Sequence, residues 1–344
     1  MRAASRWKSA SRSAHSAKAW DAPNARQSGK PHWPLFARGG VHLARDAPVG
    51  AAAAYRSGVV ALLGLPNAGK SMLFNRLLGQ KLAIVTPKPQ TTRSRLLGIR
   101  TLEHAQLLFL DTPGLHEGKG ELHASMQRAS SAAVEDCDVA LLLIDSTRGW
   151  EPAHGALAAR LASLGRPWLV VGTKGDLPRP KRAVWPPREV RDGPPALLVS
   201  ARSGAGIRAL FSAILTHLPP GPPLRGSDEL TDRPLRFLAG ELVREAVFEQ
   251  LREELPYAVA VEVDEYDETT RSDLVRIRAN LLVRRRSQKS IVVGAGGERI
   301  RSIGIQARHE IERLVERKVH LDLWVKVEED WAEQRRRIEA LGYV

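Results

Sequence analysis

The octapeptide Gly64-Leu65-Pro66-Asn67-Ala68-Gly69-Lys70-Ser71 separates two segments of different character. The apolar run Val59–Leu63 before it predicts a buried strand, and the apolar spacing of Met72–Leu78 after it predicts an amphipathic helix. The octapeptide fits the pattern G-x-x-x-x-G-K-[ST], and a preceding strand and a following helix are the context that a phosphate-binding loop requires. The sequence therefore predicts a nucleotide-binding α/β domain built around this loop.

The residues of this loop each have a predicted task. Glycines allow backbone N–H groups to turn toward phosphate oxygens, and the N-terminus of the following helix adds positive potential. We expect Lys70 to neutralise the β- and γ-phosphates and the Ser71 hydroxyl to bind Mg²⁺. The residues predicted to contact the nucleotide here are Gly64, Asn67, Ala68, Gly69, Lys70, Ser71 and Met72.

Short apolar runs of strand length alternate with helical patterns through the first folded part of the chain, residues 58–218. Continuous apolar runs are typical of strands that are buried on both faces of a parallel sheet, and their alternation with helices indicates an α/β fold. We therefore expect a mostly parallel sheet with helices on both faces. The predicted strands are Val59–Leu63, Ala105–Leu110, Val139–Ile144, Trp168–Val171 and Ala196–Val199.

Two further motifs, each directly after an apolar strand, add predicted contacts to the phosphates and to the base. Ligands bind at the carboxyl ends of strands in open α/β sheets. Asp111, which begins Asp111-Thr112-Pro113-Gly114, can hold the water shell of Mg²⁺, and Gly114 can offer its N–H to the γ-phosphate. In Thr173-Lys174-Gly175-Asp176, the carboxylate can accept hydrogen bonds from both N1–H and N2–H of guanine, a pairing that adenine cannot reciprocate.

A third motif, Ser200-Ala201, follows the last apolar strand and can close over the base. Together these elements predict a site for GTP or GDP with Mg²⁺. The residues predicted on the base side are Thr173, Lys174, Asp176, Ser200 and Ala201.

The spacing of apolar and polar residues changes after a Pro/Gly-rich stretch that begins a predicted linker, residues 219–232. Leu235–Leu255 has helical spacing, and the three segments Val259–Val263, Val275–Val283 and Val319–Val327 alternate apolar and polar residues, which indicates half-buried strands. The predicted order of helix, strand, strand, helix, helix, strand and helix describes an α+β module over residues 233–344.

This second module contains Gly294-Ala295-Gly296-Gly297 between two predicted helices. A G-x-x-G loop with two strands before it and one after it is the pattern of a type II KH domain, whose loop clamps about four unpaired nucleotides. Ala295 and Gly296 supply no cation, so the expected phosphate contacts come from neighbours: Lys289, Arg299, Arg301 and Arg308. The triple Arg284-Arg285-Arg286 is either a further RNA contact or a solvated strand end.

The formal charge of +14 is concentrated at the start of the chain. Residues 1–57 carry ten Lys or Arg against two acids, a net +8, and are rich in Ser and Ala. Such composition is typical of an organelle transit peptide, and the alternatives are a disordered basic arm that touches RNA or an upstream region translated in error. The signal does not separate mitochondrion from plastid; we expect the mitochondrial matrix, with the chloroplast stroma as the alternative.

Two absences bound the function classes. No run approaches the roughly 18 uninterrupted apolar residues that span a bilayer, so any membrane contact is expected to be peripheral. The single cysteine, Cys137, excludes an intramolecular disulfide, and we expect it to be a small buried apolar residue.

Residues 58–344 resemble the Era family of GTPases. In the first half the resemblance is carried by Lys88-Pro89-Gln90-Thr91-Thr92-Arg93 and by Asp111-Thr112-Pro113-Gly114-Leu115-His116. In the second half it is carried by Leu255-Pro256-Tyr257, by Ile303-Gly304-Ile305-Gln306-Ala307-Arg308 and by the strand Val319–Val327.

The resemblance implies that Thr92 lies in the first switch loop and reaches Mg²⁺ in the GTP state, so the metal set becomes Ser71, Thr92 and Asp111. It also implies that Leu115 stands where Ras-like enzymes carry a water-positioning glutamine. Since leucine cannot hydrogen-bond water, we expect slow hydrolysis that K⁺ stimulates, with Asn67 holding K⁺; the alternative is that Asn67 is a polar loop residue. The residues expected to serve catalysis are Lys70, Thr92, Gly114 and Asn67.

The resemblance further implies a partner and a process. The expected partner is the 3′ end of small-subunit ribosomal RNA, bound by a monomer during assembly of the small ribosomal subunit. The nucleotide state is expected to determine whether the protein binds or releases this RNA. The linker, residues 219–232, is placed to transmit the nucleotide state to the KH domain.

Two departures from the family pattern support a rival interpretation. Thr173 replaces the usual asparagine of the guanine motif, and Leu177–Pro195 is short and holds six prolines, so a long helix there is not expected. The first rival is an RNA-binding assembly chaperone that binds nucleotide without meaningful hydrolysis. The second is a GTPase of tRNA modification or membrane signalling.

Overall fold

The computed structural model describes residues 54–114, 118–181 and 183–343, all of which fall within one compact unit of the chain. The predicted leader therefore lies outside the described residues except for its last four positions. Within the described residues, no helix is sufficiently long and apolar to span a membrane.

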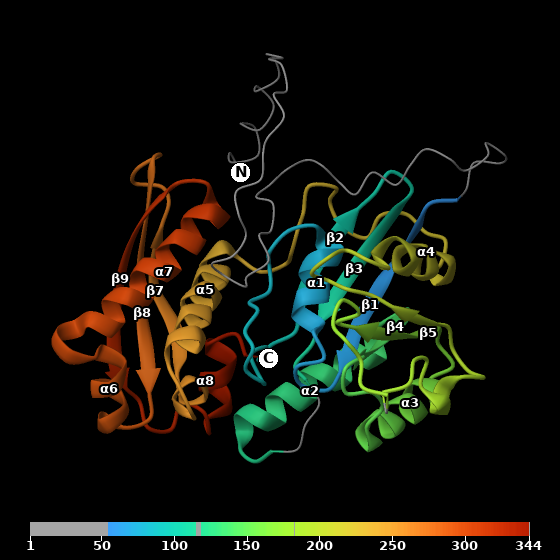
Figure 1. Cartoon of the computed structure of the whole chain (residues 1–344). Coiled ribbons are helices and arrows are strands. Elements are labelled where there is room, and N and C mark those ends of the chain that lie inside the picture. Colours follow the sequence, from blue (N-terminus) through green and yellow to red (C-terminus); the bar gives the residue numbers. More distant parts are fainter. Residues whose placement is uncertain (1–53, 115–117, 182, 344) are drawn as a thin grey trace, which may run out of the picture. The chain divides into compact units, whose positions relative to one another are not determined.

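The N-terminal domain is a six-stranded sheet of order β2-β3-β1-β4-β5-β6 (Figure 1). All neighbouring strands pair in parallel except β2 and β3, which are antiparallel. The mostly parallel sheet that the sequence predicts is confirmed. The strands are β1 (Arg56–Gly64), β2 (Leu96–Thr101), β3 (Ala105–Asp111), β4 (Val139–Asp145), β5 (Trp168–Thr173) and β6 (Ala196–Leu198).

Strand β2 is the one element of this sheet that the sequence analysis missed. It is short, and Gly98 in its centre weakens a strand pattern. The structure gives a packing reason for that glycine, because a Cβ atom there would lie 2.5 Å from Leu78 Cδ1 and 2.6 Å from Phe74 Cζ. The strand thus lies tightly against the first helix.

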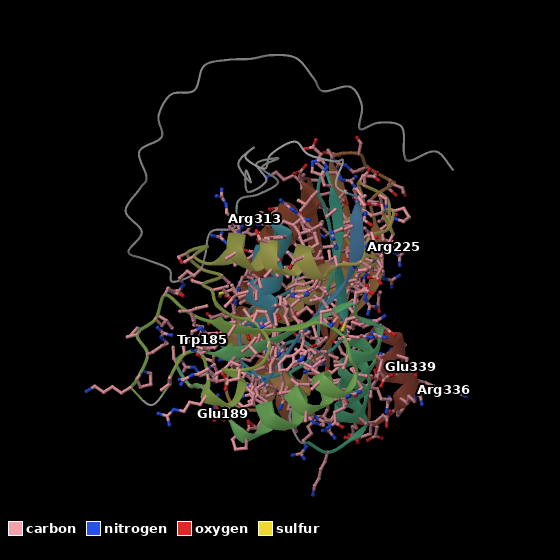
Figure 2. All side chains as sticks on the ribbon, turned by 90° about the vertical axis from the view of Figure 1, so that its right-hand side faces the viewer. Trp185, Glu189, Arg225, Arg313, Arg336 and Glu339 are labelled. Atoms are coloured by element: carbon pink, nitrogen blue, oxygen red, sulfur yellow. The ribbon has the colours of Figure 1, made fainter. Side chains whose placement is uncertain are left out.

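Helices cover both faces of the sheet. On one face α1 (Lys70–Leu78) and α4 (Ile207–His217) share a core with alternate strand residues. On the other face α2 (Glu121–Asp136) and α3 (Pro152–Ser163) do the same, and the buried Cys137 belongs to that core, as predicted. Residues 177–181 and 183–195 contain no helix or strand other than the 3₁₀ turn η1 (Arg188–Val190), which includes Glu189, labelled in Figure 2.

The linker runs along the edge of this domain. Gly221 N donates a 2.9 Å hydrogen bond to Tyr55 O, and Ser57 N donates one of 3.2 Å to Pro219 O. Further along, the Gln106 side chain bonds the backbone of Leu224 and Arg225.

The C-terminal domain has a three-stranded sheet of order β7-β8-β9, in which β7 and β8 are antiparallel and β8 and β9 are parallel. Its order of elements is the predicted one, and the fold is that of a KH domain. The elements are α5 (Leu235–Gln250), η2 (Leu255–Ala258), β7 (Ala260–Asp267), β8 (Leu274–Val283), α6 (Arg286–Val293), η3 (Ala295–Gly297), α7 (Glu298–Val315), β9 (Lys318–Val327) and α8 (Arg335–Ala340).

Two apolar clusters hold this domain together. Helices α5, α6 and α7 form the main core with one face of the sheet. A smaller apolar cluster joins the sheet to the C-terminal segment. It contains Ala260 of β7 and Leu282 of β8, together with Trp331, Ile338 and Tyr343.

Candidate nucleotide site and RNA-binding surface

The phosphate loop joins β1 to α1, as the sequence predicts. Gly69 precedes the helix in a left-handed conformation (φ 82°), and Asn67 adopts φ 63°. The Lys70 side chain is buried and its Nζ donates to the backbone oxygens of Gly64 (3.1 Å) and Leu65 (2.9 Å). The ammonium group therefore lies inside the loop, where an anion can replace the carbonyl contacts.

Gly114 lies against this loop. A Cβ atom on it would come within 2.9 Å of Pro66 N and 3.2 Å of Lys70 Nζ. Only glycine allows this close approach, which brings the start of the segment after β3 to the phosphate side of the site. Leu115 lies outside the described residues.

Three side chains predicted to bind Mg²⁺ converge beside the loop. Ser71 Oγ donates to Asp111 Oδ2 at 2.7 Å and lies 2.9 Å from Thr92 Oγ1, and Thr92 Oγ1 lies 3.4 Å from Asp111 Oδ2. The second carboxylate oxygen, Asp111 Oδ1, is buried without a hydrogen-bond partner within the described structure. Two hydroxyls and one carboxylate with a spare oxygen fit Mg²⁺, which takes one or two carboxylates and completes its shell with water and phosphate.

No cluster of three His, Cys, Asp or Glu side chains suited to a metal ion occurs in residues 54–114, 118–181 and 183–343.

Burial controls the electrostatics of the phosphate side. It lowers the pKa of Lys70 to about 8, although Asp111 acts in the opposite direction. Burial also raises the pKa of Asp111 to about 6, against the hydrogen bond from Ser71 and the charge of Lys70. Both charged forms are disfavoured by burial because the site is closed to water, and a phosphate group and a cation would relieve both costs.

The guanine motif is tied directly to the phosphate loop. Thr173 Oγ1 donates to Ala68 O at 2.7 Å and also lies 3.2 Å from Ile144 O. Gly175 N donates to Val199 O at 2.9 Å, so the two base-side loops are joined as well. The threonine that departs from the family pattern thus bridges the strand end and the loop.

The remaining base-side residues surround an open edge. Lys174 has φ 56°, and its Nζ lies 2.6 Å from Asp145 Oδ2. Burial acts to raise the pKa of Asp145, but the hydrogen bonds from Lys174 and Thr147 outweigh it and lower that pKa. Asp176 is exposed, and Ser200 is buried with its Oγ accepting a 3.0 Å bond from Ser203 N.

Asn67 and Met72 occupy the two ends of the loop region. Asn67 is exposed, and its side chain has no hydrogen-bond partner within the described residues. Met72 lies in the first turn of α1 and is half-buried.

The KH loop has the predicted position between α6 and α7. Gly294, Gly296 and Gly297 have φ of 77°, 56° and 80°, and a Cβ on Gly294 would lie 2.8 Å from Arg299 Cβ. Gly296 and Gly297 face open space, so a sugar-phosphate backbone can approach them. Ala295 is exposed on the same loop.

The four predicted cations divide into two kinds. Arg299 Nη1 donates to Ile291 O at 2.6 Å, and Arg308 Nη1 lies 3.5 Å from Glu312 Oε1. Lys289 and Arg301 are exposed, and their side chains have no hydrogen-bond or ion-pair partner in the described structure. Lys289 and Arg301 are therefore the more available of the four for an anion.

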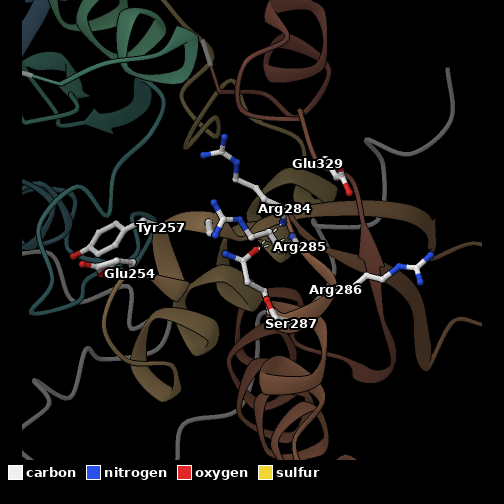
Figure 3. A pocket seen from close by; sticks show the side chains of 9 residues that line it. Glu254, Tyr257, Arg284, Arg285, Arg286, Ser287 and Glu329 are labelled. Carbon is white, nitrogen blue, oxygen red and sulfur yellow. Dashed lines mark hydrogen bonds between the residues drawn. The ribbon is translucent and has the colours of Figure 1, made fainter.

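The arginine triple lies at the opposite end of α6 from the KH loop. It lines a pocket of about 890 Å³ with Glu254, Tyr257 and Glu329, and its side chains point in different directions, with Arg286 directed away from the other two (Figure 3). Arg284 lies 3.4 Å from Glu333. The three charges do not converge on one point, so the geometry indicates no focused anion site.

Four residues to which the sequence alone assigns no role stand out in the structure by their exposure or burial. Ile291 and Ile305, each 48% exposed, stand on the two helices that flank the KH loop. Arg93 and Arg244 are 3% and 0% exposed, and both connect the two domains. Arg93 belongs to a motif that the sequence analysis quoted, but a buried arginine leaves no periodic signal.

Comparison with protein families gives two matches. The model described as "50S ribosome-binding GTPase" matches residues 59–174, and the model described as "KH domain" matches residues 254–332. The first match extends from within β1 to the end of β5, and the second covers all three strands of the C-terminal sheet.

Relatives with the same architecture match over most of the chain. GTPase Era of Xylella fastidiosa (strain M12) is 44% identical over 294 residues, which is 84% of this chain and 98% of that protein. GTPase Era of Nitratidesulfovibrio vulgaris (strain DP4) is 40% identical over 304 residues, covering 84% and 97%.

Solved structures agree. Era in complex with MgGDPNP and nucleotides 1506–1542 of 16S ribosomal RNA has a TM-score of 0.80 at 38% identity, covering 84% of this chain and 99% of that one. A point variant of Aquifex aeolicus Era bound to GDP.AlF4- gives the same TM-score, identity and coverage. This chain, with its N-terminal GTPase domain and C-terminal KH domain, belongs to the Era family of GTPases.

Proposed function

We propose that this protein hydrolyses GTP and uses its nucleotide state to control the binding of the 3′ end of small-subunit ribosomal RNA to its KH domain, in support of small-subunit assembly. The observation that carries the proposal is the convergence of Ser71, Thr92 and Asp111 beside the phosphate loop in a chain that also contains a KH domain.

The catalytic part of the proposal assigns each residue a task. Lys70 neutralises charge on the β- and γ-phosphates, and the Gly114 N–H donates a hydrogen bond to a γ-phosphate oxygen. Ser71, Thr92 and Asp111 would hold Mg²⁺, which when bound offsets the charge of the phosphate oxygens. Asp176 selects guanine through its carboxylate. These assignments are supported by the burial of Lys70 and by the unpartnered Asp111 Oδ1.

The rate and the ion requirement are further parts of the proposal. We expect slow turnover that K⁺ stimulates, with the Asn67 side chain holding K⁺ near the transferring phosphate. Its support is that Asn67 lies in the phosphate loop, is exposed, and makes no hydrogen bond to the described residues that would compete with an ion.

The RNA part rests on the KH loop and its surroundings. The open positions Gly296 and Gly297 accept a backbone, Lys289 and Arg301 attract phosphates, and Ile291 and Ile305 offer apolar contact to unstacked bases. A related Era has been solved with nucleotides 1506–1542 of 16S ribosomal RNA, which supports the choice of RNA. We expect the protein to act as a monomer.

The place of action is also a proposal. The basic, acid-poor composition of residues 1–57 supports import into an organelle, with the mitochondrial matrix favoured over the chloroplast stroma. Fusing residues 1–57 to a fluorescent protein and locating it in cells tests this part, and a diffuse cytosolic signal would contradict it.

A GTPase assay with the Lys70→Ala variant as control tests the main proposal. The wild type should release phosphate from GTP and not from ATP, and the variant should be inactive. Guanine binding without hydrolysis above the variant's level would favour the chaperone without hydrolysis. Crosslinking that recovers tRNA in place of small-subunit ribosomal RNA would favour the rival class of GTPases.

A further inference from the structure

The segment between α1 and β2 is fastened to the KH domain along much of its length. We call residues 81–93 the strap. At its start, Lys81 Nζ lies 2.6 Å from Glu245 Oε2 and 3.1 Å from Glu310 Oε2. Val85 N donates to Glu245 Oε1 at 3.0 Å. Ile84, between them, is buried in the apolar core of the KH domain.

The middle of the strap is held by α5. Lys88 Nζ donates to the carbonyl oxygens of Phe248 and Leu251, which belong to the last turn and C-cap of that helix, where a cation is favourable. From the other side, Arg244 Nη1 donates to Thr91 O at 2.6 Å. Burial acts to lower the pKa of Arg244, but the charge and hydrogen bond of Glu241, together with the charges of Tyr343 and Glu245, outweigh it and raise that pKa.

The end of the strap enters an aromatic cage. The guanidinium carbon of Arg93 lies 5.8 Å from the ring centre of Phe248, 5.5 Å from that of Trp331 and 5.3 Å from that of Tyr343. Its nitrogens donate to Val259 O and Tyr257 O, each at 2.8 Å.

Only an arginine suits this cage. Its planar fork can face three ring systems and donate to two carbonyls at once, whereas a lysine offers one ammonium point. Burial lowers the pKa of Arg93 to about 10, so the group stays charged at neutral pH. Such a buried charge is costly unless its contacts are complete, so displacing Arg93 from the cage would leave both the cation and the carbonyls unsatisfied.

The strap brings these anchors to the nucleotide site. Thr92, whose hydroxyl lies 2.9 Å from Ser71 Oγ and 3.4 Å from Asp111 Oδ2, stands between Thr91 and Arg93. The carbonyl of the first neighbour and the side chain of the second are both held by the KH domain. Thr92 therefore cannot move far from the metal side of the site unless the KH contacts also change.

The same cage touches the second side of the GTPase domain. Ser125 Oγ of α2 donates to Tyr343 O at 2.8 Å, and Leu122 N donates to Ala332 O at 3.1 Å. Helix α2 follows the segment that contains Gly114. Helix α2 thus contacts the C-terminal segment that contributes Tyr343 to the Arg93 cage.

We infer that Arg93 is the positioning residue through which the magnesium-side threonine Thr92 and the RNA-binding KH domain control each other. This inference rests on the proposed function and supplies its physical route. The expected route is the strap, in place of the linker, which is fastened to the edge of the GTPase domain. By linkage, a nucleotide that holds Thr92 in place must alter RNA affinity by the same factor by which RNA alters nucleotide affinity.

The test compares RNA affinity in two nucleotide states. We would measure the Kd of the full chain for a fluorescent RNA with the sequence of nucleotides 1506–1542 of 16S ribosomal RNA, in Mg²⁺ with GDPNP or with GDP. The wild-type ratio of the two constants should differ from one by at least about fivefold, the lower end of typical coupling. In Arg93→Lys the ratio should fall to within about twofold of one.

Matched controls separate coupling from damage to the fold. Arg95→Lys is the same substitution two residues away, on a partly exposed arginine paired with Asp136, and it should keep the wild-type ratio. Lys88→Met removes the hydrogen bonds of the Lys88 ammonium group at a less buried position of the strap. It should bring the ratio closer to one even if Arg93→Lys does not fold. A structural defect alone would weaken RNA binding equally in both nucleotide states.

The outcomes are distinguishable. An Arg93→Lys or Lys88→Met protein that keeps a wild-type ratio different from one overturns the inference and leaves the proposed function standing. A wild-type ratio near one overturns the inference together with the part of the proposed function in which the nucleotide state controls RNA binding. A wild type that binds neither guanine nucleotide nor the RNA overturns the proposed function itself. Loss of the ratio in both strap variants, with the reciprocal effect of RNA on GDPNP affinity lost by the same factor, supports the inference.

Discussion

The hydroxyl of Thr173 donates a 2.7 Å hydrogen bond to the backbone oxygen of Ala68, which joins the guanine motif to the phosphate loop. Thr173 is 3% exposed, and a Cβ atom added to Gly69 would lie 3.7 Å from its side chain. A short hydroxyl group therefore makes the contact between the two loops.

Removing this hydroxyl should weaken nucleotide binding. Thr173→Val keeps the shape and leaves Ala68 O without its donor, which costs about 1 to 3 kcal/mol for a buried acceptor. We expect the Kd for GDP, measured by calorimetry, to rise about tenfold (1.4 kcal/mol). Thr216→Val is the matched control, since Thr216 bonds Ala213 O on the outside of α4. Equal affinities of both variants would contradict the bridging role.

Base selection should depend on Asp176. Its carboxylate can accept two hydrogen bonds from guanine, and bonds to a charged group contribute about 1.5 to 3 kcal/mol. Asp176→Asn should weaken GTP binding at least about tenfold and strengthen binding of xanthosine triphosphate, which presents an acceptor where guanine presents its amino group. Competition binding with the two nucleotides measures this, and the exposed Asp192→Asn serves as the control. A variant that still prefers GTP would show that another group reads the base.

Nucleotide binding in the presence of Mg²⁺ should have a pH optimum. The pKa of Asp111 is raised to about 6, so this carboxyl is protonated below that pH and cannot bind a cation. For one group of this pKa, lowering the pH from 7 to 5 should weaken Mg²⁺-dependent GDPNP binding about tenfold. At high pH, Lys70 loses its charge above about 8, and affinity should fall again.

The acid limb of that profile identifies the group. Asp111→Asn should bind Mg²⁺-GDPNP weakly at every pH, and the change in its Kd between pH 5 and 7 should shrink to what the nucleotide phosphates alone produce. A wild-type profile as flat as that of the variant would exclude Asp111 as the titrating ligand.

Potassium should act through Asn67. Replacing K⁺ by Na⁺ should slow GTP hydrolysis of the wild type, because the smaller ion fits a site for K⁺ less well. Asn67→Ala should be slow in both salts and should keep its fold, since the Asn67 side chain is exposed and makes no hydrogen bond to another described residue. Turnover of the wild type that is equal in the two salts would remove K⁺ from the mechanism.

The KH loop offers a test of RNA binding by charge. Gly296 faces open space at φ 56°, a conformation that aspartate tolerates, so Gly296→Asp should fold and repel phosphate. Ala295→Lys adds the missing cation and should tighten binding of single-stranded RNA. It should also steepen the dependence of log K on log salt by about 0.7 for one added phosphate contact. Filter binding over a salt series measures both, and unchanged affinities would place the RNA elsewhere.

Local signals were enough for the two folds and for the expectation that the side chains of the predicted nucleotide site lie near one another. The strand before Gly64 and the helix after Ser71 lie where the sequence predicts them, because apolar runs and amphipathic spacing depend only on nearby residues. The side chains at successive strand ends meet because parallel strands present their carboxyl ends at one edge. The same applies to the KH order of elements.

Contacts between residues far apart in the chain needed the tertiary structure. Nothing in the pattern around Arg93 or Arg244 indicates that these charges are buried. The carbonyls and rings around Arg93, and the Thr91 carbonyl that Arg244 contacts, come from residues more than 150 positions away. The bridging role of Thr173, 105 positions from Ala68, is of the same kind. The sequence by itself determined which chemistry the protein carries, since motifs are local. Only the tertiary structure decided how its two halves are joined, since that depends on the packing of surfaces that no local pattern describes.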